Sequence, residues 1–168
     1  MKTAKISQVL LAAIERLFRE DIFLLKYDVH EQTISHRIAV YLESHFSEHH
    51  VDCEYNNDLD SETGRKQVYF PSENAISPVI PDIVVHHRGL NGPEHNLLVI
   101  ELKKLPGTPS ELARDRDKLC GFTASDQESH LSYRCGAFVT LGVKEAAGKY
   151  KIEWFEQGVL VEVLVEEE

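Results

Sequence analysis

The segment LLVIELKK places the strongest constraint on the fold of this chain. Residues 97–100 form a continuous apolar run, which is typical of a central strand covered on both faces of a sheet. The run leads directly into Glu101 and Lys103, whose side chains share one face because strand side chains alternate with a period of two. A carboxylate and an ammonium at the end of a buried strand destabilise the fold unless they have partners. A divalent metal ion and a phosphate are suitable partners.

A strand that precedes this segment places another carboxylate nearby. Residues 80–87 and 96–103 are expected to form two strands, and the turn-forming stretch RGLNGPEHN between them predicts a hairpin. Antiparallel pairing brings Asp82, near the start of the first strand, beside Glu101 and Lys103 at the end of the second. Two carboxylates and a backbone carbonyl oxygen are ligands that suit Mg²⁺.

Helices and further strands are expected on both sides of this hairpin. Apolar spacing predicts helices over 4–26, 29–47, 111–121 and 125–132, with Asp28 and Ser110 as the N-caps of the second and third. Strands are expected over 51–55, 65–70, 134–141, 149–155 and 159–165, and irregular chain over 56–64 and 71–80. This order predicts an α/β fold in which a mixed central sheet is flanked by helices, with an additional N-terminal helix.

The residues of the hairpin resemble the signature of the PD-(D/E)xK nuclease superfamily. The letters PD at positions 81–82 are followed, after eighteen residues, by ELK at positions 101–103. The resemblance implies a restriction-endonuclease-like core, with the order helix, three-stranded antiparallel sheet, helix and strand. That core would cover residues 29–141 of one domain spanning 1–168.

The resemblance also implies Mg²⁺-dependent hydrolysis of DNA phosphodiester bonds. Asp82 and Glu101, with the carbonyl of Leu102, would hold one Mg²⁺, and Mn²⁺ would substitute for it. Lys103 would orient or deprotonate the attacking water. Glu31, on the preceding helix, would help to bind a second metal or would hydrogen-bond Lys103. An endonuclease is favoured over an exonuclease.

Glu31 has a structural alternative to this catalytic role. It lies three residues after Asp28, so the two could form a capping box at the start of a helix. Against this, Glu31 shares a helix face with Ile34 and Ile38, which turns its side chain toward the sheet.

Four basic residues are weaker candidates for contacts with nucleic acid. Lys104 points away from the face of the ELK carboxylate and is expected to be solvated or to contact a phosphate. Lys118 alternates with acidic residues along its helix, which is typical of a solvated face, but it could also contact phosphate. Arg65 and Lys66, where the loop over 56–64 meets the strand expected over 65–70, are similar candidates.

The net charge of the chain limits the affinity for DNA that it can have by itself. The net charge is −10, but seven acids in residues 41–63 and six in 152–168 more than account for it, and neither segment contains Lys or Arg. The remainder can therefore present a locally basic face, although weak non-specific DNA affinity is expected. A homodimer could supply additional affinity, and residues 159–165 are a candidate edge strand for its pairing. A larger nuclease or defence complex is the other possible source.

Two other functions remain open beside the nuclease. One is a non-catalytic binding module that has kept the nuclease fold. The other is a subunit of a restriction, repair or defence assembly that binds other proteins through the acidic segments 41–63 and 152–168.

Composition excludes several other classes of protein. No apolar run approaches the ~20 residues of a membrane-spanning helix, so no membrane association is expected. The amphipathic N-terminal segment is unlike a secretory signal, which makes a cytoplasmic location the expectation. Three cysteines without a CxxC pair favour reduced thiols over a disulfide framework or a zinc ribbon.

Overall fold

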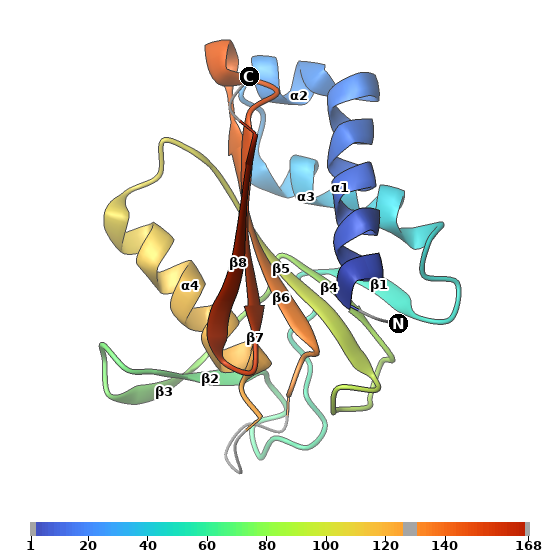
Figure 1. Cartoon of the computed structure of the whole chain (residues 1–168). Coiled ribbons are helices and arrows are strands. Elements are labelled where there is room, and N and C mark those ends of the chain that lie inside the picture. Colours follow the sequence, from blue (N-terminus) through green and yellow to red (C-terminus); the bar gives the residue numbers. More distant parts are fainter. Residues whose placement is uncertain (1–2, 126–130, 167–168) are drawn as a thin grey trace.

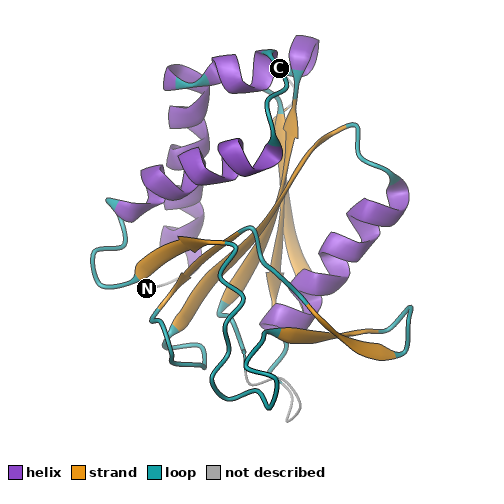
Figure 2. Cartoon of the chain, turned by 180° about the vertical axis from the view of Figure 1, so that it is seen from behind, coloured by secondary structure: helices purple, strands orange, loops and turns teal. Residues whose placement is uncertain are grey.

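A mixed six-stranded sheet with helices on both faces forms the body of the protein (Figures 1 and 2). The computed structural model describes residues 3–125 and 131–166. The helical segments are α1 (Thr3–Glu20), α2 (Ile22–Lys26), α3 (Glu31–Glu43), α4 (Pro109–Thr123) and the 3-10 turn η1 (Lys144–Ala146). The strands are β1 (His50–Cys53), β2 (Gln67–Phe70), β3 (Ala75–Pro78), β4 (Ile83–His86), β5 (Asn96–Leu105), β6 (Cys135–Gly142), β7 (Tyr150–Glu156) and β8 (Val159–Glu166).

The sheet has the strand order β1-β4-β5-β6-β7-β8. β4 pairs antiparallel with both β1 and β5, whereas β6 runs parallel to β5 after the chain returns through α4. β7 and β8 extend the sheet in antiparallel fashion, and β8 is its edge strand. The predicted α/β class, with a mixed sheet between helices, is therefore confirmed.

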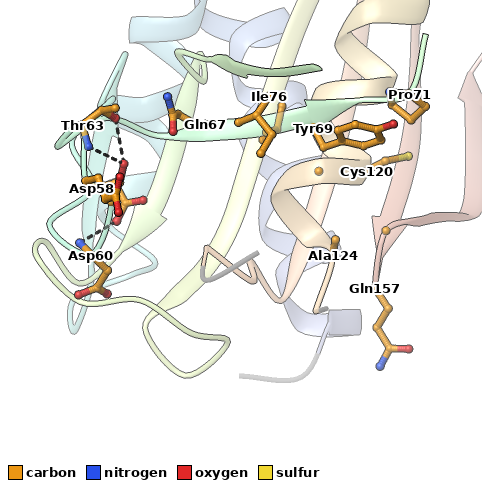
Figure 3. Close-up of a pocket in the computed structure, with 15 residues that line it drawn as sticks. Asp58, Asp60, Thr63, Gln67, Tyr69, Pro71, Ile76, Cys120, Ala124 and Gln157 are labelled. Atoms are coloured by element: carbon orange, nitrogen blue, oxygen red, sulfur yellow. Dashed lines mark hydrogen bonds between the residues drawn. The ribbon is translucent and has the colours of Figure 1, made fainter. Parts of the chain in front are cut away.

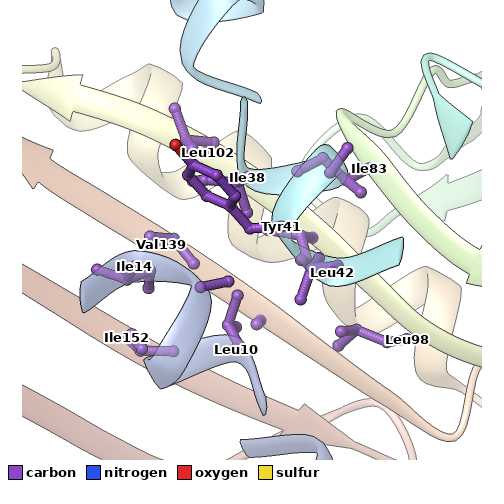
Figure 4. Packing of buried hydrophobic residues seen from close by; sticks show 14 of the residues in the cluster. Leu10, Ile14, Ile38, Tyr41, Leu42, Ile83, Leu98, Leu102, Val139 and Ile152 are labelled. Carbon is purple, nitrogen blue, oxygen red and sulfur yellow. The ribbon is translucent and has the colours of Figure 1, made fainter. Parts of the chain in front are cut away.

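Strand β5 lies at the centre of this sheet and is buried from Asn96 to Leu102. Leu98 and Ile100 pack into the hydrophobic layer that contains α1 and α3 (Figure 4). Val99 packs into the opposite layer, under α4 and the β2–β3 hairpin. The apolar run of the sequence thus corresponds to a strand covered on both faces, as its composition predicts.

The prediction of one N-terminal helix over 4–26 is wrong in one respect, because the helix is interrupted at Asp21. The Asp21 carboxylate accepts hydrogen bonds from Arg37 Nε (2.8 Å) and from the Tyr41 hydroxyl, both on α3. These tertiary bonds hold Asp21 outside helical geometry, at φ −129° and ψ 25°. α1 and α2 are consequently two helices.

The starts of α3 and α4 also differ from the predictions. His30, and not Asp28, is the N-cap of α3, and its Nδ1 accepts the Gln32 N–H at 3.3 Å. Thr108, and not Ser110, caps α4 in a capping box with Glu111. Asp28 has a φ of 51°, which is incompatible with capping and turns its side chain to Lys104 instead.

Residues 71–80, predicted to be irregular, contain β3. This strand pairs only with β2 among the described residues, in a separate two-stranded sheet. Packing of β2 against α4 supports the hairpin, a long-range contact that local sequence does not reveal. The helix predicted over 125–132 falls mainly on residues outside the described part of the chain, and 131–132 are not helical. No helix in the described ranges is long and apolar enough to cross a membrane.

A substitution in α4 separates helix propensity from packing. A Cβ added at Gly121 would lie 2.6 Å from Val68 Cβ on β2. We therefore expect Gly121→Ala to lower the free energy of unfolding by about 1–3 kcal/mol, because overpacking outweighs the gain in helix propensity. Denaturant unfolding measures the change.

Ala113→Gly, on the exposed side of α4, is the matched control. It should cost about 1 kcal/mol through propensity alone. A Gly121→Ala variant more stable than the native protein would show that the hairpin does not press on α4 as described.

Candidate active site

The four predicted site residues meet at the end of β5. Asp82 directly precedes β4. Ile83 pairs with Ile100 in the antiparallel β4–β5 pair, and the preceding residue, Asp82, therefore lies across from Glu101. Glu31 is the first residue of α3, and its carboxylate reaches Lys103 from the other layer of the fold. The structure therefore brings together side chains separated by 72 positions in the sequence.

Glu101 is the most deeply buried charge of this group, with 1% of its surface exposed. Its Oε2 forms an ion pair with Lys118 Nζ on α4. Its Oε1 is buried and has no hydrogen-bond partner among the described residues. Burial, together with the negative charge of Asp82, raises the pKa of Glu101 well above its usual value, and Lys118 opposes this shift. One oxygen of the Glu101 carboxylate is therefore paired with Lys118, and the other is buried without a hydrogen-bond partner among the described residues.

Asp82 is anchored by the backbone of β5. Its Oδ2 accepts the N–H of Leu102 at 2.6 Å. Burial raises the pKa of Asp82 to about 6, despite the opposing effect of this hydrogen bond. In an antiparallel pair, the N–H and C=O of one residue point toward the same neighbouring strand. Because the Leu102 N–H is bonded to Asp82, the Leu102 carbonyl also points to the side of β5 on which Asp82 lies.

Lys103 lies between two carboxylates. Its Nζ is 3.2 Å from Glu31 Oε1 and 3.7 Å from Asp115 Oδ2. Burial acts to lower the pKa of Lys103, but the charges of Glu31 and Asp115 outweigh it, and the pKa lies above its usual value. Lys103 is therefore a stable cation in this site.

Glu31 acts as a bridge and not as a helix cap. Its Oε1 accepts from Lys103 Nζ, and its Oε2 accepts the backbone N–H of Lys104 at 3.0 Å. The capping-box alternative with Asp28 is wrong, because His30 occupies the N-cap position. Both carboxylate oxygens of Glu31 are committed to β5.

Asp115 and Lys118 of α4 belong to the site, although the alternation of charges along this helix predicts a solvated or phosphate-contacting face. Asp115 is only 8% exposed, and its Oδ1 is 3.0 Å from Lys118 Nζ. The charges of Glu101 and Asp115 outweigh burial and raise the pKa of Lys118. The signal that could have identified Asp115 is its spacing from Leu112 and Leu119, which places all three on the inward face of the helix.

The site contains more negative than positive charge. Four carboxylates and two ammonium groups make up the site: Glu31, Asp82, Glu101, Asp115, Lys103 and Lys118. When all six are ionised, two negative charges remain uncompensated. Burial is the main cause of the raised pKa values of Asp82 and Glu101, and neighbouring carboxylates of this cluster add to it.

Most of the basic residues proposed for nucleic-acid contact are engaged elsewhere. Lys104 is held by Asp28 Oδ1 and by the Val29 carbonyl, each at 2.7 Å, and is not a solvated lysine. Lys66 lies outside any strand, but it is 2% exposed and donates to the Asn57 carbonyl at 2.9 Å, which leaves it unavailable for the predicted nucleic-acid contact. Arg65 is hydrogen-bonded to Asn56.

A cleft of about 730 Å³ opens at the end of β5 and contains Glu31 and Lys103 in its wall. Its rim is formed by η1 and by the residues between β5 and α4. A second cavity, of about 580 Å³, lies between the 58–63 loop, the β2–β3 hairpin and the end of α4 (Figure 3). This second cavity contains none of the six charged groups, whereas two of them, Glu31 and Lys103, line the cleft, and the other four lie behind it around the end of β5. The cleft with this cluster is the candidate active site.

The sequence matches no protein-family model and no curated protein.

The buried carboxyl of Asp82 should make the metal-free protein less stable at high pH. Its pKa in the folded state, about 6, lies above its usual value of 3.8. Stability from this group is complete below 3.8 and is lost as the pH rises through 6. In chelator at pH 8, we expect Asp82→Asn to raise the free energy of unfolding by about 1–3 kcal/mol, an advantage that disappears near pH 4.

Denaturant unfolding across this pH range measures the effect. Asp60→Asn, at an exposed aspartate, is the control and should give a difference that does not change with pH. A constant difference for Asp82→Asn as well would contradict the assigned burial of its charge.

Proposed function

We propose that this protein is a metal-dependent nuclease of the PD-(D/E)xK type that hydrolyses phosphodiester bonds in DNA. The observation that carries the proposal is the buried Oε1 of Glu101, which lacks a partner among the described residues and lies across the strand pair from Asp82. A buried, unpartnered carboxylate oxygen is costly unless a ligand completes it. A divalent cation has the charge and the oxygen preference that this position requires.

The donor set fits Mg²⁺ or Mn²⁺. Glu101 Oε1, the carboxylate of Asp82 and the carbonyl of Leu102 would hold the ion, and the excess of two negative charges matches its valence. No group of three or more His, Cys, Asp or Glu side chains among the described residues is arranged to hold a metal. Such a sparse protein ligand set suits Mg²⁺, which usually retains several waters and binds only one or two carboxylates.

Lys103 and Glu31 would have separate roles beside the metal. When bound, the metal would polarise the scissile phosphate and lower the pKa of its bound water. Lys103, kept protonated by Glu31 and Asp115, would orient the attacking water and offset charge on the phosphate. Its raised pKa favours this role over that of a base. Because Glu31 already binds Lys103 and the backbone of β5, holding Lys103 is favoured over binding a second metal.

The topology supports the same assignment. The order α3, β1, β4, β5, α4, β6, with three antiparallel strands and then a parallel one, is the order that the nuclease resemblance implies. The β2–β3 hairpin is an insertion between β1 and β4. α1 precedes the core, and β7 and β8 follow it.

Replacing Lys103 tests the proposed catalysis. We expect Lys103→Met to lower cleavage by at least about 100-fold while metal binding persists, because the ammonium acts on water and phosphate and not on the metal. The assay incubates plasmid, linear and single-stranded DNA with Mg²⁺, Mn²⁺ or chelator. Lys149→Met, at an exposed lysine, is the control and should cut normally. Equal cutting by both variants would exclude Lys103 from the chemistry.

Metal binding is tested separately from activity. Titration calorimetry with Mn²⁺ should show binding to the native protein, and Mg²⁺ should raise its melting temperature because it binds only the folded state. Glu101→Gln and Asp82→Asn should each remove most of the heat and most of the shift. Absence of binding to the native protein would favour the non-catalytic module instead.

A further inference from the structure

Two exposed aromatic rings stack on one another beside the cleft. Phe23 on α2 and Tyr27, its C-cap, are 60% and 68% exposed. Their ring centroids are 4.1 Å apart with an angle of 29° between the planes. Two large aromatic side chains this exposed are costly to keep in water, and stacking hides only part of their surface.

The chain connects this pair directly to the rim of the candidate active site. Asp28, which follows Tyr27, forms part of the cleft wall and binds Lys104 Nζ at 2.7 Å. Lys144 on η1 reaches Asp28 Oδ2 at 3.3 Å, and α2 packs against η1 (Figure 1). Tyr27 therefore directly precedes a residue of the cleft, and Phe23 lies on the short helix that packs against η1 at the rim.

The charges of the protein make a stacking platform useful at this place. Affinity for duplex DNA depends largely on Lys and Arg contacts to phosphates. The net charge is −10, and the cations nearest the site are paired with carboxylates: Lys103 with Glu31, Lys104 with Asp28, Lys118 with Glu101, Arg114 with Glu73 and Arg116 with Glu153. Stacking of a base on an aromatic ring needs no such charge.

We propose that Phe23 and Tyr27 form a platform on which unpaired nucleobases stack, so that the substrate is single-stranded nucleic acid or carries a single-stranded segment next to the cut. The inference rests on the proposed nuclease function of the neighbouring cleft. A base would extend the existing two-ring stack, while its phosphate lies toward Lys103. A duplex, whose bases are already stacked on each other, cannot use this surface without opening.

Binding measured without metal tests the platform independently of cleavage. Fluorescence anisotropy in chelator compares labelled strands of about 12 nucleotides, a length within the usual site size for single-stranded binding. The ligands are single-stranded DNA, single-stranded RNA, a blunt DNA duplex and an abasic strand that keeps only the phosphate backbone. We expect the native protein to bind the base-containing strands at least about 5-fold more tightly than the abasic strand and the duplex.

Variants assign this preference to the two rings. Phe23→Ala with Tyr27→Ala should reduce single-strand affinity to that of the abasic strand, and Tyr27→Phe should retain it. Tyr69→Ala, at an exposed aromatic residue that lines the other cavity, is the matched control. The DNA and RNA arms show which kind of strand supplies the base.

Several results would overturn the platform while leaving the nuclease intact. One is equal affinity for base-containing and abasic strands, and another is unchanged affinity in the double alanine variant. A native dimer in sedimentation that this variant converts to monomer would assign the rings to a second copy instead. Failure of Mn²⁺ binding and of cleavage, by contrast, would overturn the nuclease function itself.

Discussion

The apposition of Asp82 and Glu101 at the end of a doubly buried strand is the interaction on which the site depends. Burial removes hydration from both carboxylates and raises the pKa of each, and the charge of Asp82 adds to the shift of Glu101. The fold offsets this cost with Lys118 from α4 and with the backbone N–H of Leu102. α4 therefore contributes charge to the site as well as hydrophobic cover to the sheet.

The lysines connect the two helical layers across the end of β5. Lys103 reaches Glu31 on α3 and Asp115 on α4, while Lys118 reaches Glu101 and Asp115. Because each ammonium is shared between elements that are distant in sequence, the charged groups fix how α3 and α4 sit against the sheet. Within this cluster, Glu101 Oε1 is buried and has no hydrogen-bond partner among the described residues.

The same pairing that stabilises the site leaves few cations free for a nucleic acid. Lys104 and the arginines of α4 are bound to carboxylates of neighbouring elements. For the nuclease function that we propose, phosphate contacts alone would give weak binding, and stacking near the cleft would have to add to it. The exposed and mutually stacked rings of Phe23 and Tyr27 are the surface that we propose for this stacking.

The sequence by itself determined the central strand and the placement of Asp82, Glu101 and Lys103, because the alternation of side chains along a strand and the pairing of a hairpin are local rules. It also placed Glu31 on the inward face of its helix. Only the tertiary structure decided that Asp21 breaks the first helix, that β3 forms a strand and that Lys66 is buried. It alone brought Lys118 to the carboxylates, since an alternation of charges looks the same on a solvated helix and on one packed over a charged site; only for Asp115 does the spacing from Leu112 and Leu119 indicate an inward position. The physical reason is that these outcomes depend on partners distant in sequence, whose contacts outweigh local preference.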